Sequence, residues 1–172
     1  SPWDLDSVEF LEQYDLPFVK IPSALLTDYK LIKECARRYD KLILSTGMST
    51  IDEIDDAIIA MGGEIRNYDS HMRQCEYTLL HCNSSYPAKV NELNLSCIQT
   101  LKDRYKCEVG YSGHESSLLK VCISAVVLGA TSIERHITLD RSMWGTDQAA
   151  SLSPAGMRML CNSFKKIEYI LG

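Results

Sequence analysis

The stretch VGYSGHESSLLKVCISAVVLGATSIERHI, residues 109–137, contains a complete strand–helix–strand unit. It begins with a short β-rich run over 109–112 and ends with another over 132–137. Between them, apolar residues at i, i+3 and i+4 predict a helix over 117–128, and Gly129 follows where a glycine cap is expected. The two runs are apolar without strict alternation, which is typical of strands buried on both faces of a parallel sheet.

The same alternation continues through the rest of the chain. Further helix starts are signalled by a capping box over 50–53 and by Pro154 after Ser153, because proline is tolerated in a first helical turn. The long connection over 62–76 is expected to be a surface excursion without chemistry. Strands are predicted over 18–21, 42–45 and 77–82, and helices over 5–14, 29–38, 51–60, 94–105 and 155–171. Five such repeats predict an α/β fold with a parallel sheet.

Length and composition restrict the class of protein. The 172 residues fit one domain or a piece of one, with 45% hydrophobic and 24% charged residues. The net charge of −5 argues against a nucleic-acid partner, and no apolar run is long enough for a membrane span. Seven cysteines form no CxxC pair, so we expect reduced, buried thiols in a cytoplasmic protein rather than disulfides or a zinc site.

Polar residues at the strand ends favour a barrel over an open sheet. No GxGxxG follows a strand, which removes the dinucleotide-binding fingerprint. A (β/α)8 barrel collects its functional groups from the carboxyl ends of many strands. Five strands cannot close a barrel of eight, so we expect a partial (β/α)8 barrel. The polar strand-end residues are Lys20, Ser23, Ser45, Ser84, Tyr86, Ser112, His114, Glu134 and His136.

Each of these residues has a functional and a structural interpretation. His114 and His136 follow consecutive strands, so the two imidazoles are able to hold a divalent metal, or else each caps a strand end. Lys20 is a candidate for a Schiff base or a phosphate contact, or a lysine that extends to solvent. The serines are hydroxyl donors for an anion or ordinary loop residues. Their combination at five strand ends favours a functional site.

Five strand-end motifs carry a resemblance to a known family. They read Lys20-Ile-Pro-Ser23, Leu44-Ser-Thr-Gly-Met48, Leu80-His-Cys-Asn-Ser-Ser-Tyr-Pro87, Gly110-Tyr-Ser-Gly-His114 and Ile133-Glu-Arg-His-Ile-Thr-Leu-Asp140. In order and spacing they resemble the sialic acid synthase family, whose members condense phosphoenolpyruvate with N-acetylmannosamine or a related amino sugar on a metal-containing (β/α)8 barrel. The resemblance implies that residues 1–172 supply strands four to eight with their helices. The first two strands, most of the third and a C-terminal domain resembling antifreeze proteins would then be absent.

The resemblance also implies roles for individual residues. His114 and His136 correspond to ligands of a divalent metal, manganese or magnesium. The expected catalytic residues are Lys20, Glu134 and Asp147, and the expected sugar contacts are Tyr86 and Asp147. The expected phosphoenolpyruvate contacts are Lys20, Ser23, Ser45, Ser84 and Ser112. A homodimer is expected for the full-length protein, and the 172 residues alone are expected to be inactive.

Three departures from the family pattern concern the sugar. Leu25 stands where many members carry a glutamate near the reacting aldehyde, and Gly113 where many carry aspartate. Residues 143–148 read Met-Trp-Gly-Thr-Asp-Gln, in place of the commoner Pro-Gly-Pro-Asp-His type of ending. We expect a less polar acceptor, such as a deoxy or diacetamido relative of N-acetylmannosamine, unless a group such as Gln148 replaces the glutamate.

Two other functions stay open from the sequence. One is a class I aldolase-like lyase that uses Lys20 as a Schiff base and needs no metal. The other is a non-catalytic, incomplete barrel that retains the scaffold without the activity.

Overall fold

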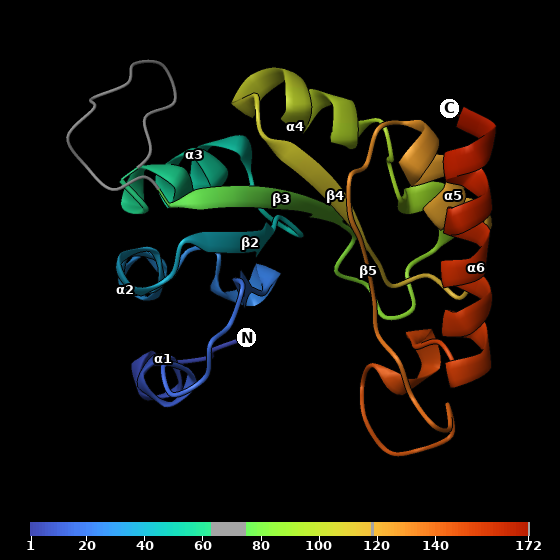
Figure 1. Ribbon diagram of the computed structural model, residues 1–172, viewed down its shortest axis with the longest axis horizontal. Helices are drawn as coiled ribbons and strands as arrows, with labels where there is room; N and C mark the ends of the chain where they lie inside the picture. Colours follow the sequence, from blue (N-terminus) through green and yellow to red (C-terminus); the bar gives the residue numbers. More distant parts are fainter. Residues whose placement is uncertain (63–74, 118, 172) are drawn as a thin grey trace. The chain divides into compact units, whose positions relative to one another are not determined.

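The computed structural model describes residues 1–62, 75–117 and 119–171. Strands and helices alternate along the chain (Figure 1), and five strands are assigned to one sheet in the order β1-β2-β3-β4-β5. Strand β1 pairs with β2, β2 with β3, and β4 with β5, each time in parallel. The predicted α/β class is therefore confirmed. The connection expected over 62–76 lies, from 63 to 74, outside the described residues.

The chain divides into two compact units, each described here by itself. The first comprises residues 1–80 and 101–108, and the second comprises residues 81–100 and 109–172. No helix within the described ranges has the combination of length and apolar character that a membrane crossing requires.

The first unit places helices against three parallel strands. The strands are β1 (Val19–Ile21), β2 (Lys41–Ser45) and β3 (Glu76–Cys82), of which residues up to Leu80 belong to this unit. In register, Lys20 lies opposite Ile43 and Ser45 lies opposite Leu80. The apolar side chains of these strands, such as Ile21, Leu42 and Leu79, are fully buried together with Val8 and Ile32 of the helices. The helices are α1 (Leu5–Leu11), α2 (Tyr29–Arg38), α3 (Ile51–Ala60), the 3-10 helix η1 (Ser23–Leu25) and the last part of α4 (Cys97–Tyr105).

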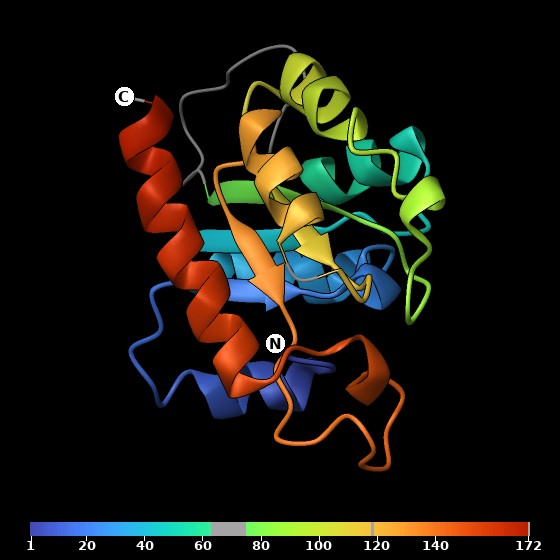
Figure 2. The same ribbon diagram turned by 90° about the vertical axis from the view of Figure 1, so that its right-hand side faces the viewer.

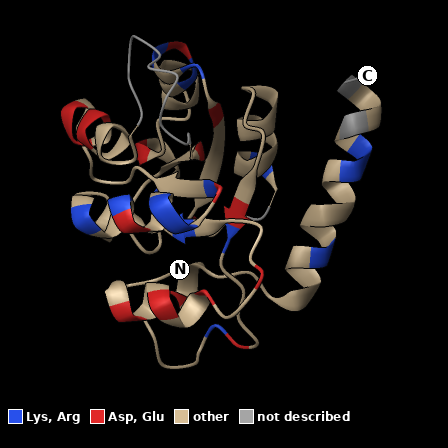
Figure 3. Cartoon of the chain, turned by 60° about the vertical axis from the view of Figure 1, so that its left-hand side comes forward, with Lys and Arg blue, Asp and Glu red and all other residues tan. Residues whose placement is uncertain are grey.

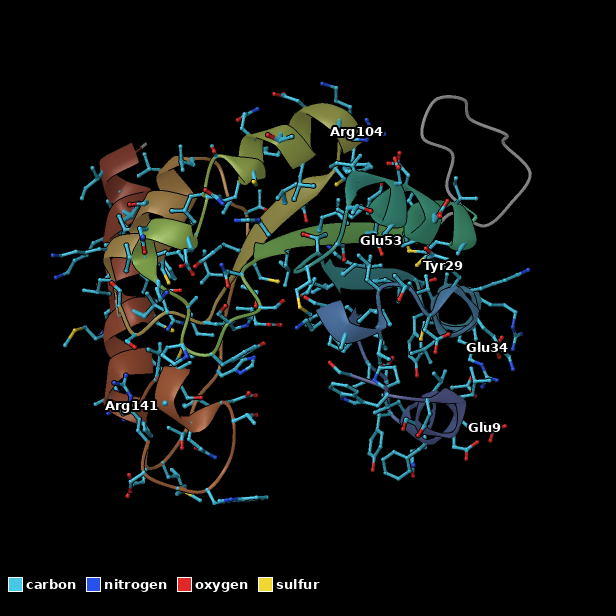
Figure 4. The ribbon with its side chains drawn as sticks, turned by 180° about the vertical axis from the view of Figure 1, so that it is seen from behind. Glu9, Tyr29, Glu34, Glu53, Arg104 and Arg141 are labelled. Atoms are coloured by element: carbon cyan, nitrogen blue, oxygen red, sulfur yellow. The ribbon has the colours of Figure 1, made fainter. Side chains whose placement is uncertain are left out.

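Local sequence signals account for the helices of this unit. Helix α2 begins after Asp28, whose carboxylate accepts the backbone N–H of Leu31, and α3 begins with the predicted capping box of Thr50 and Glu53. Glu53 and Arg104 are labelled in Figure 4, and the Arg104 side chain pairs with Asp55 of α3.

Helix α2 carries four basic residues and a single acidic one, Glu34 (Figure 3). Glu34 pairs with Arg37 and Arg38 one turn later, and the two guanidinium groups lower the pKa of the Glu34 carboxyl to about 2. Glu34 therefore offsets part of the positive charge of this helix, and Arg38 also pairs with Glu12 of the preceding segment.

The second unit is built around two strands and two helices: β4 (Glu108–Gly113), β5 (Ile133–Arg135), α5 (Lys120–Val127) and α6 (Pro154–Leu171). Strand β4 belongs to this unit from Val109 onward. Helices α5 and α6 pack together (Figure 2) through a buried cluster of Cys122, Leu152 and Leu160. Ile133 of β5 packs against the same cluster. Two short 3-10 helices, η2 (Val90–Glu92) and η3 (Gln148–Ala150), lie in the loops after β3 and β5.

The predicted caps of this unit are confirmed. Gly129 adopts a φ of 94°, its N–H donates to the carbonyl of Val126, and the N–H of Ala130 donates to the carbonyl of Ala125. This is the hydrogen-bond pattern of a glycine-terminated helix. Helix α6 begins at Pro154, and the preceding Ser153 hydroxyl accepts the N–H of Gly156.

Several predicted boundaries differ from the structure. Helix α4 begins at Cys97 rather than at residue 94, because Asn94 has a φ of 46° and cannot continue a right-handed helix. Strand β5 ends at Arg135, and Ile137 then forms an isolated bridge with Leu152. Helix α1 ends at Leu11, three residues earlier than expected.

The cysteines are less uniformly buried than predicted. Cys35, Cys82 and Cys122 are buried, whereas Cys161 is exposed on α6 and the remaining three are partly exposed. The apolar stretches around the cysteines therefore predicted their burial only in part.

Candidate active site

Three potential metal ligands meet in the second unit. Ligand atoms of His114, Glu134 and His136 all lie within 4.8 Å of one another. The two imidazole ring centroids are 5.2 Å apart. His114 follows β4 and His136 follows β5, and these neighbouring parallel strands place Ser112 opposite Glu134. The strand order therefore brings the three side chains to one edge of the sheet.

The surroundings of His114 define which of its nitrogens faces the cluster. Its Nδ1 lies 2.6 Å from the carbonyl oxygen of Asn83, which can only accept a hydrogen bond. The proton therefore resides on Nδ1, and Nε2 carries the lone pair. The Tyr86 hydroxyl lies 3.1 Å from Nε2, and the Tyr86 ring stacks on the imidazole with centroids 4.1 Å apart.

His136 is oriented in the same sense by a carboxylate. Its Nδ1 lies 3.2 Å from Oδ2 of Asp147, while its Nε2 lies 4.0 Å from Oε1 of Glu134. A carboxylate on Nδ1 fixes the tautomer that presents Nε2 as a ligand. The backbone carbonyl of His136 accepts the N–H of Leu152 at 2.8 Å, which anchors the main chain.

Glu134 is held by a serine. The buried Ser112 hydroxyl donates to Oε1 of Glu134 at 2.8 Å and also lies 3.2 Å from Nε2 of His114. Ser112 thus links the carboxylate to one imidazole.

The donor set fits a divalent metal. Two imidazoles whose Nδ1 atoms are held by oxygen atoms, together with one carboxylate, are typical ligands of first-row divalent ions with coordination positions left for other ligands. The hydrogen bonds on both Nδ1 atoms are the outer contacts that metal-binding histidines ordinarily make.

Tyr86 is a hydrogen-bond donor in this site. Partial burial, and secondarily the carboxylate of Asp147, the Cys82 thiol and the carboxylate of Glu134, raise the pKa of the Tyr86 hydroxyl to about 12. The hydroxyl therefore keeps its proton near neutral pH. About two-fifths of the residue is exposed to solvent, so it can reach a bound molecule.

Three of the predicted anion contacts lie in the first unit. Lys20 belongs to β1, Ser23 begins η1, and Ser45 ends β2. The Ser23 hydroxyl accepts the N–H of Gly47 at 3.0 Å. Ser45 is buried, and its hydroxyl has no hydrogen-bond partner among the residues that the structure describes. Strands β1 and β2 are parallel neighbours, so their carboxyl ends share one edge of the sheet.

The other two predicted anion contacts lie in the second unit. Ser84 lies in the loop after β3, in the second unit, with a partly exposed side chain. Ser112, in that unit, contacts the histidine cluster directly. Leu25, where many members carry a glutamate, ends η1 in the first unit, and it is only partly buried. The roles of all these residues stay predictions.

Sequence reasoning missed two contacts of the cluster. Asn83 was not expected to take part, because its contribution is a backbone carbonyl and carries no side-chain signature. The pairing of Asp147 with His136 was also unforeseen. A carboxylate eleven residues after a histidine gives no local pattern that would have revealed it.

The chain is similar to named synthases over its whole length. It is 41% identical to the N,N'-diacetyllegionaminic acid synthase of Campylobacter jejuni, over 100% of this chain and 49% of that protein. It is 37% identical to the N,N'-diacetyllegionaminic acid synthase of Legionella pneumophila, over 99% of this chain and 46% of that protein. The chain therefore spans about half the length of the curated relatives it matches.

A solved structure shows the same fold. The N-acetylneuraminic acid (sialic acid) synthetase of Leptospira borgpetersenii, crystallised with citrate, matches with a TM-score of 0.87 and 32% identity, over 99% of this chain and 56% of that one. The chain is accordingly a partial (β/α)8 barrel, as its strand ends predicted. The model of the NeuB family matches residues 1–172. The chain belongs to the NeuB family.

Proposed function

We propose that this chain is part of a nonulosonate synthase that condenses phosphoenolpyruvate with an N-acetylated amino sugar and releases phosphate. The observation that carries the proposal is the convergence of His114, Glu134 and His136 in a chain of the NeuB family. The names of its relatives, which are synthases of legionaminic and sialic acids, support the same reaction class.

The proposed cofactor is a divalent metal held by His114 and His136, with Glu134 beside or bound to it. Magnesium is bound almost entirely by oxygen ligands, whereas first-row transition ions also accept imidazole nitrogen, so the donor set favours manganese over magnesium. When bound, the ion would supply Lewis-acid polarisation of the sugar aldehyde.

The residues of the second unit have separate proposed tasks. Tyr86 keeps its proton and donates a hydrogen bond to the open-chain sugar. Asp147 orients His136 through Nδ1, and its half-exposed carboxylate also accepts hydrogen bonds from sugar hydroxyls. C3 of phosphoenolpyruvate bonds to the aldehyde carbon, and the aldehyde oxygen becomes an alkoxide. Water then adds to C2, and Glu134 accepts the proton that the water loses and passes it to the alkoxide. The bond between C2 and the phosphate oxygen breaks, the C2 hydroxyl proton leaves with the phosphate, and C2 becomes a carbonyl.

The proposed phosphoenolpyruvate site includes Lys20 and the serines at positions 23, 45, 84 and 112. The buried Ser45 hydroxyl supports it, since a polar group with no hydrogen-bond partner among the described residues is suited to an external one. Lys20 would neutralise the phosphate or carboxylate as a point charge. Holding the reacting carbons within attack distance can lower the barrier by roughly 7–11 kcal/mol at best.

The proposed acceptor is a diacetamido deoxy sugar rather than N-acetylmannosamine. Two relatives are named for a product with two N-acetyl groups. Leu25 supports the same choice, because it can neither accept a hydrogen bond from a sugar hydroxyl nor carry a proton. Its partial exposure makes the penalty for an unpartnered hydroxyl smaller than a buried leucine would impose.

The proposal is tested with the full-length protein, manganese, phosphoenolpyruvate and either sugar. We expect phosphate release and a nonulosonic acid detected by mass spectrometry, faster with the diacetamido sugar. His114→Ala should abolish turnover while the thermal melt stays cooperative. If no phosphate is released with either sugar, the proposed reaction is contradicted. A preference for N-acetylmannosamine would contradict only the proposed acceptor. Borohydride trapping of pyruvate on Lys20 would instead identify the lyase.

A further inference from the structure

A buried ion pair lies directly behind the candidate metal ligands. Glu115 follows His114 in the chain, and Arg135 separates Glu134 from His136. The Glu115 carboxylate pairs with Nη1 of Arg135, and both side chains are completely shielded from solvent. Because successive side chains of an extended chain point to opposite faces, the pair occupies the face opposite the ligands.

Both carboxylate oxygens of Glu115 accept hydrogen bonds within the protein. The Tyr111 hydroxyl donates to Oε2 of Glu115 at 2.7 Å, while Oε1 accepts from Arg135. A Cβ on Gly113 would lie 2.9 Å from Oε2 of Glu115 and 3.0 Å from Cδ of Arg135. The backbone immediately before His114 therefore packs against the ion pair, and glycine at 113 provides the space.

The guanidinium of Arg135 also holds two separate main-chain segments through three carbonyl groups. It donates to the carbonyl of Glu115 at 2.6 Å, to that of Ser117 at 3.1 Å and to that of Ala150 at 3.4 Å. Ala150 ends η3, the short helix whose N-cap is Asp147, the residue that orients His136. The segments that carry His114, Glu134, His136 and Asp147 thus all meet at one side chain.

Stability alone does not explain such a pair. Two charges removed from water lose their hydration, and a well-packed apolar pair of similar volume is often as stable or more stable. What an apolar pair cannot reproduce is the directional contact with three carbonyls and one carboxylate, which fixes the segments relative to one another.

We propose that Arg135, together with Glu115, is the positioning group of the metal centre: the buried pair sets the spacing of His114, Glu134 and His136. This inference rests on the metal site of the proposed function. Outer contacts of metal ligands ordinarily change metal affinity by about 10–100-fold, and the pair acts on both imidazoles at once.

The test measures manganese binding to the full-length protein by electron paramagnetic resonance, together with thermal melts. The decisive variant is the apolar double substitution E115L/R135M, which leaves no uncompensated charge. We expect a cooperative melt at a lower temperature, because the buried Tyr111 hydroxyl and the three carbonyls lose these partners. The manganese Kd should rise at least about tenfold, with an altered spectrum of the bound ion. A double variant with wild-type affinity would overturn the proposal.

A matched control separates positioning from general loss of stability. Asp55→Asn breaks the Arg104–Asp55 ion pair, which belongs to the first unit and, among the residues that the structure describes, shares no contact with Glu115 or Arg135, and should leave the manganese Kd within about twofold of the wild type. An equal loss of affinity in this control would also overturn the proposal.

Two further outcomes are assigned in advance. If E115L/R135M does not fold, Arg135→Lys replaces it, since lysine keeps the charge but cannot reach all three carbonyls; an unchanged Kd in Arg135→Lys overturns the proposal. If the wild type binds no manganese, the metal site itself fails and the inference fails with it. If the wild type binds manganese and the variants bind it with the same Kd, the inference fails and the proposed function survives without it.

Discussion

Replacing Ser45 by alanine should stabilise the protein and weaken its binding of phosphoenolpyruvate. The Ser45 hydroxyl is buried at the end of β2, and no described residue forms a hydrogen bond with it. A buried polar group without a partner costs about 1–3 kcal/mol. Removing an atom as small as a hydroxyl oxygen leaves little void, so we expect a gain near the lower limit, about 1 kcal/mol. That gain corresponds to a rise in Tm of roughly 2–4 °C in a domain of this size.

The same hydroxyl has the opposite effect when phosphoenolpyruvate is bound. A hydrogen bond from a neutral hydroxyl to a charged phosphate or carboxylate is worth about 1.5–3 kcal/mol. Its loss in Ser45→Ala should therefore raise the KM for phosphoenolpyruvate about 10–100-fold, with the KM for the sugar nearly unchanged.

The assay combines thermal melts without substrate and steady-state kinetics of the full-length protein. Ser132→Ala is the matched control, because the Ser132 hydroxyl is also buried without a described partner but lies just before β5, where no substrate contact is predicted. It should gain stability and leave both KM values unchanged. A Ser45→Ala variant that is destabilised, or whose KM for phosphoenolpyruvate equals that of the wild type, would refute the reasoning.

Three further predictions follow from other contacts. Asp147→Asn removes the carboxylate from Nδ1 of His136 and should raise the manganese Kd about tenfold. This is the lower end of the range for outer contacts, because Asp147 is half-exposed, and an unchanged Kd in a binding titration would contradict the prediction. Lys20→Ala should raise the KM for phosphoenolpyruvate far more than that for the sugar, and equal effects on both would indicate a structural lysine. In the folded protein, iodoacetamide at pH 8 should label exposed Cys161 well before Cys35, whose pKa burial raises to about 12; mass spectrometry showing the reverse order would contradict the burial of Cys35.

Local signals were sufficient for much of the fold. Helices α2 and α3 begin and end at the predicted residues, because Asp28 and the Thr50–Glu53 capping box specify their starts within the sequence itself. The start of α4 was missed, because Asn94 adopts a left-handed conformation, which asparagine tolerates but which the apolar spacing does not signal. The end of β5 was missed for a related reason: the bridge to Leu152 comes from a segment fifteen residues after Ile137.

The candidate site was predictable only in its side chains of strong chemical character. His114 and His136 were identifiable because each follows a strand, and parallel neighbouring strands necessarily bring such residues together. The ion pair of Glu115 and Arg135 was not, although both residues adjoin the histidines. They are 20 positions apart, and the sequence carries no sign of which charge a buried arginine contacts.

The metal centre is tested most directly by anomalous diffraction at the manganese absorption edge, from crystals of the full-length protein soaked in manganese. We expect one strong anomalous peak bounded by Nε2 of His114, Nε2 of His136 and the carboxylate of Glu134. A peak bound elsewhere, or no peak at this cluster when manganese is present in the crystal, would contradict the assignment of His114 and His136 as ligands.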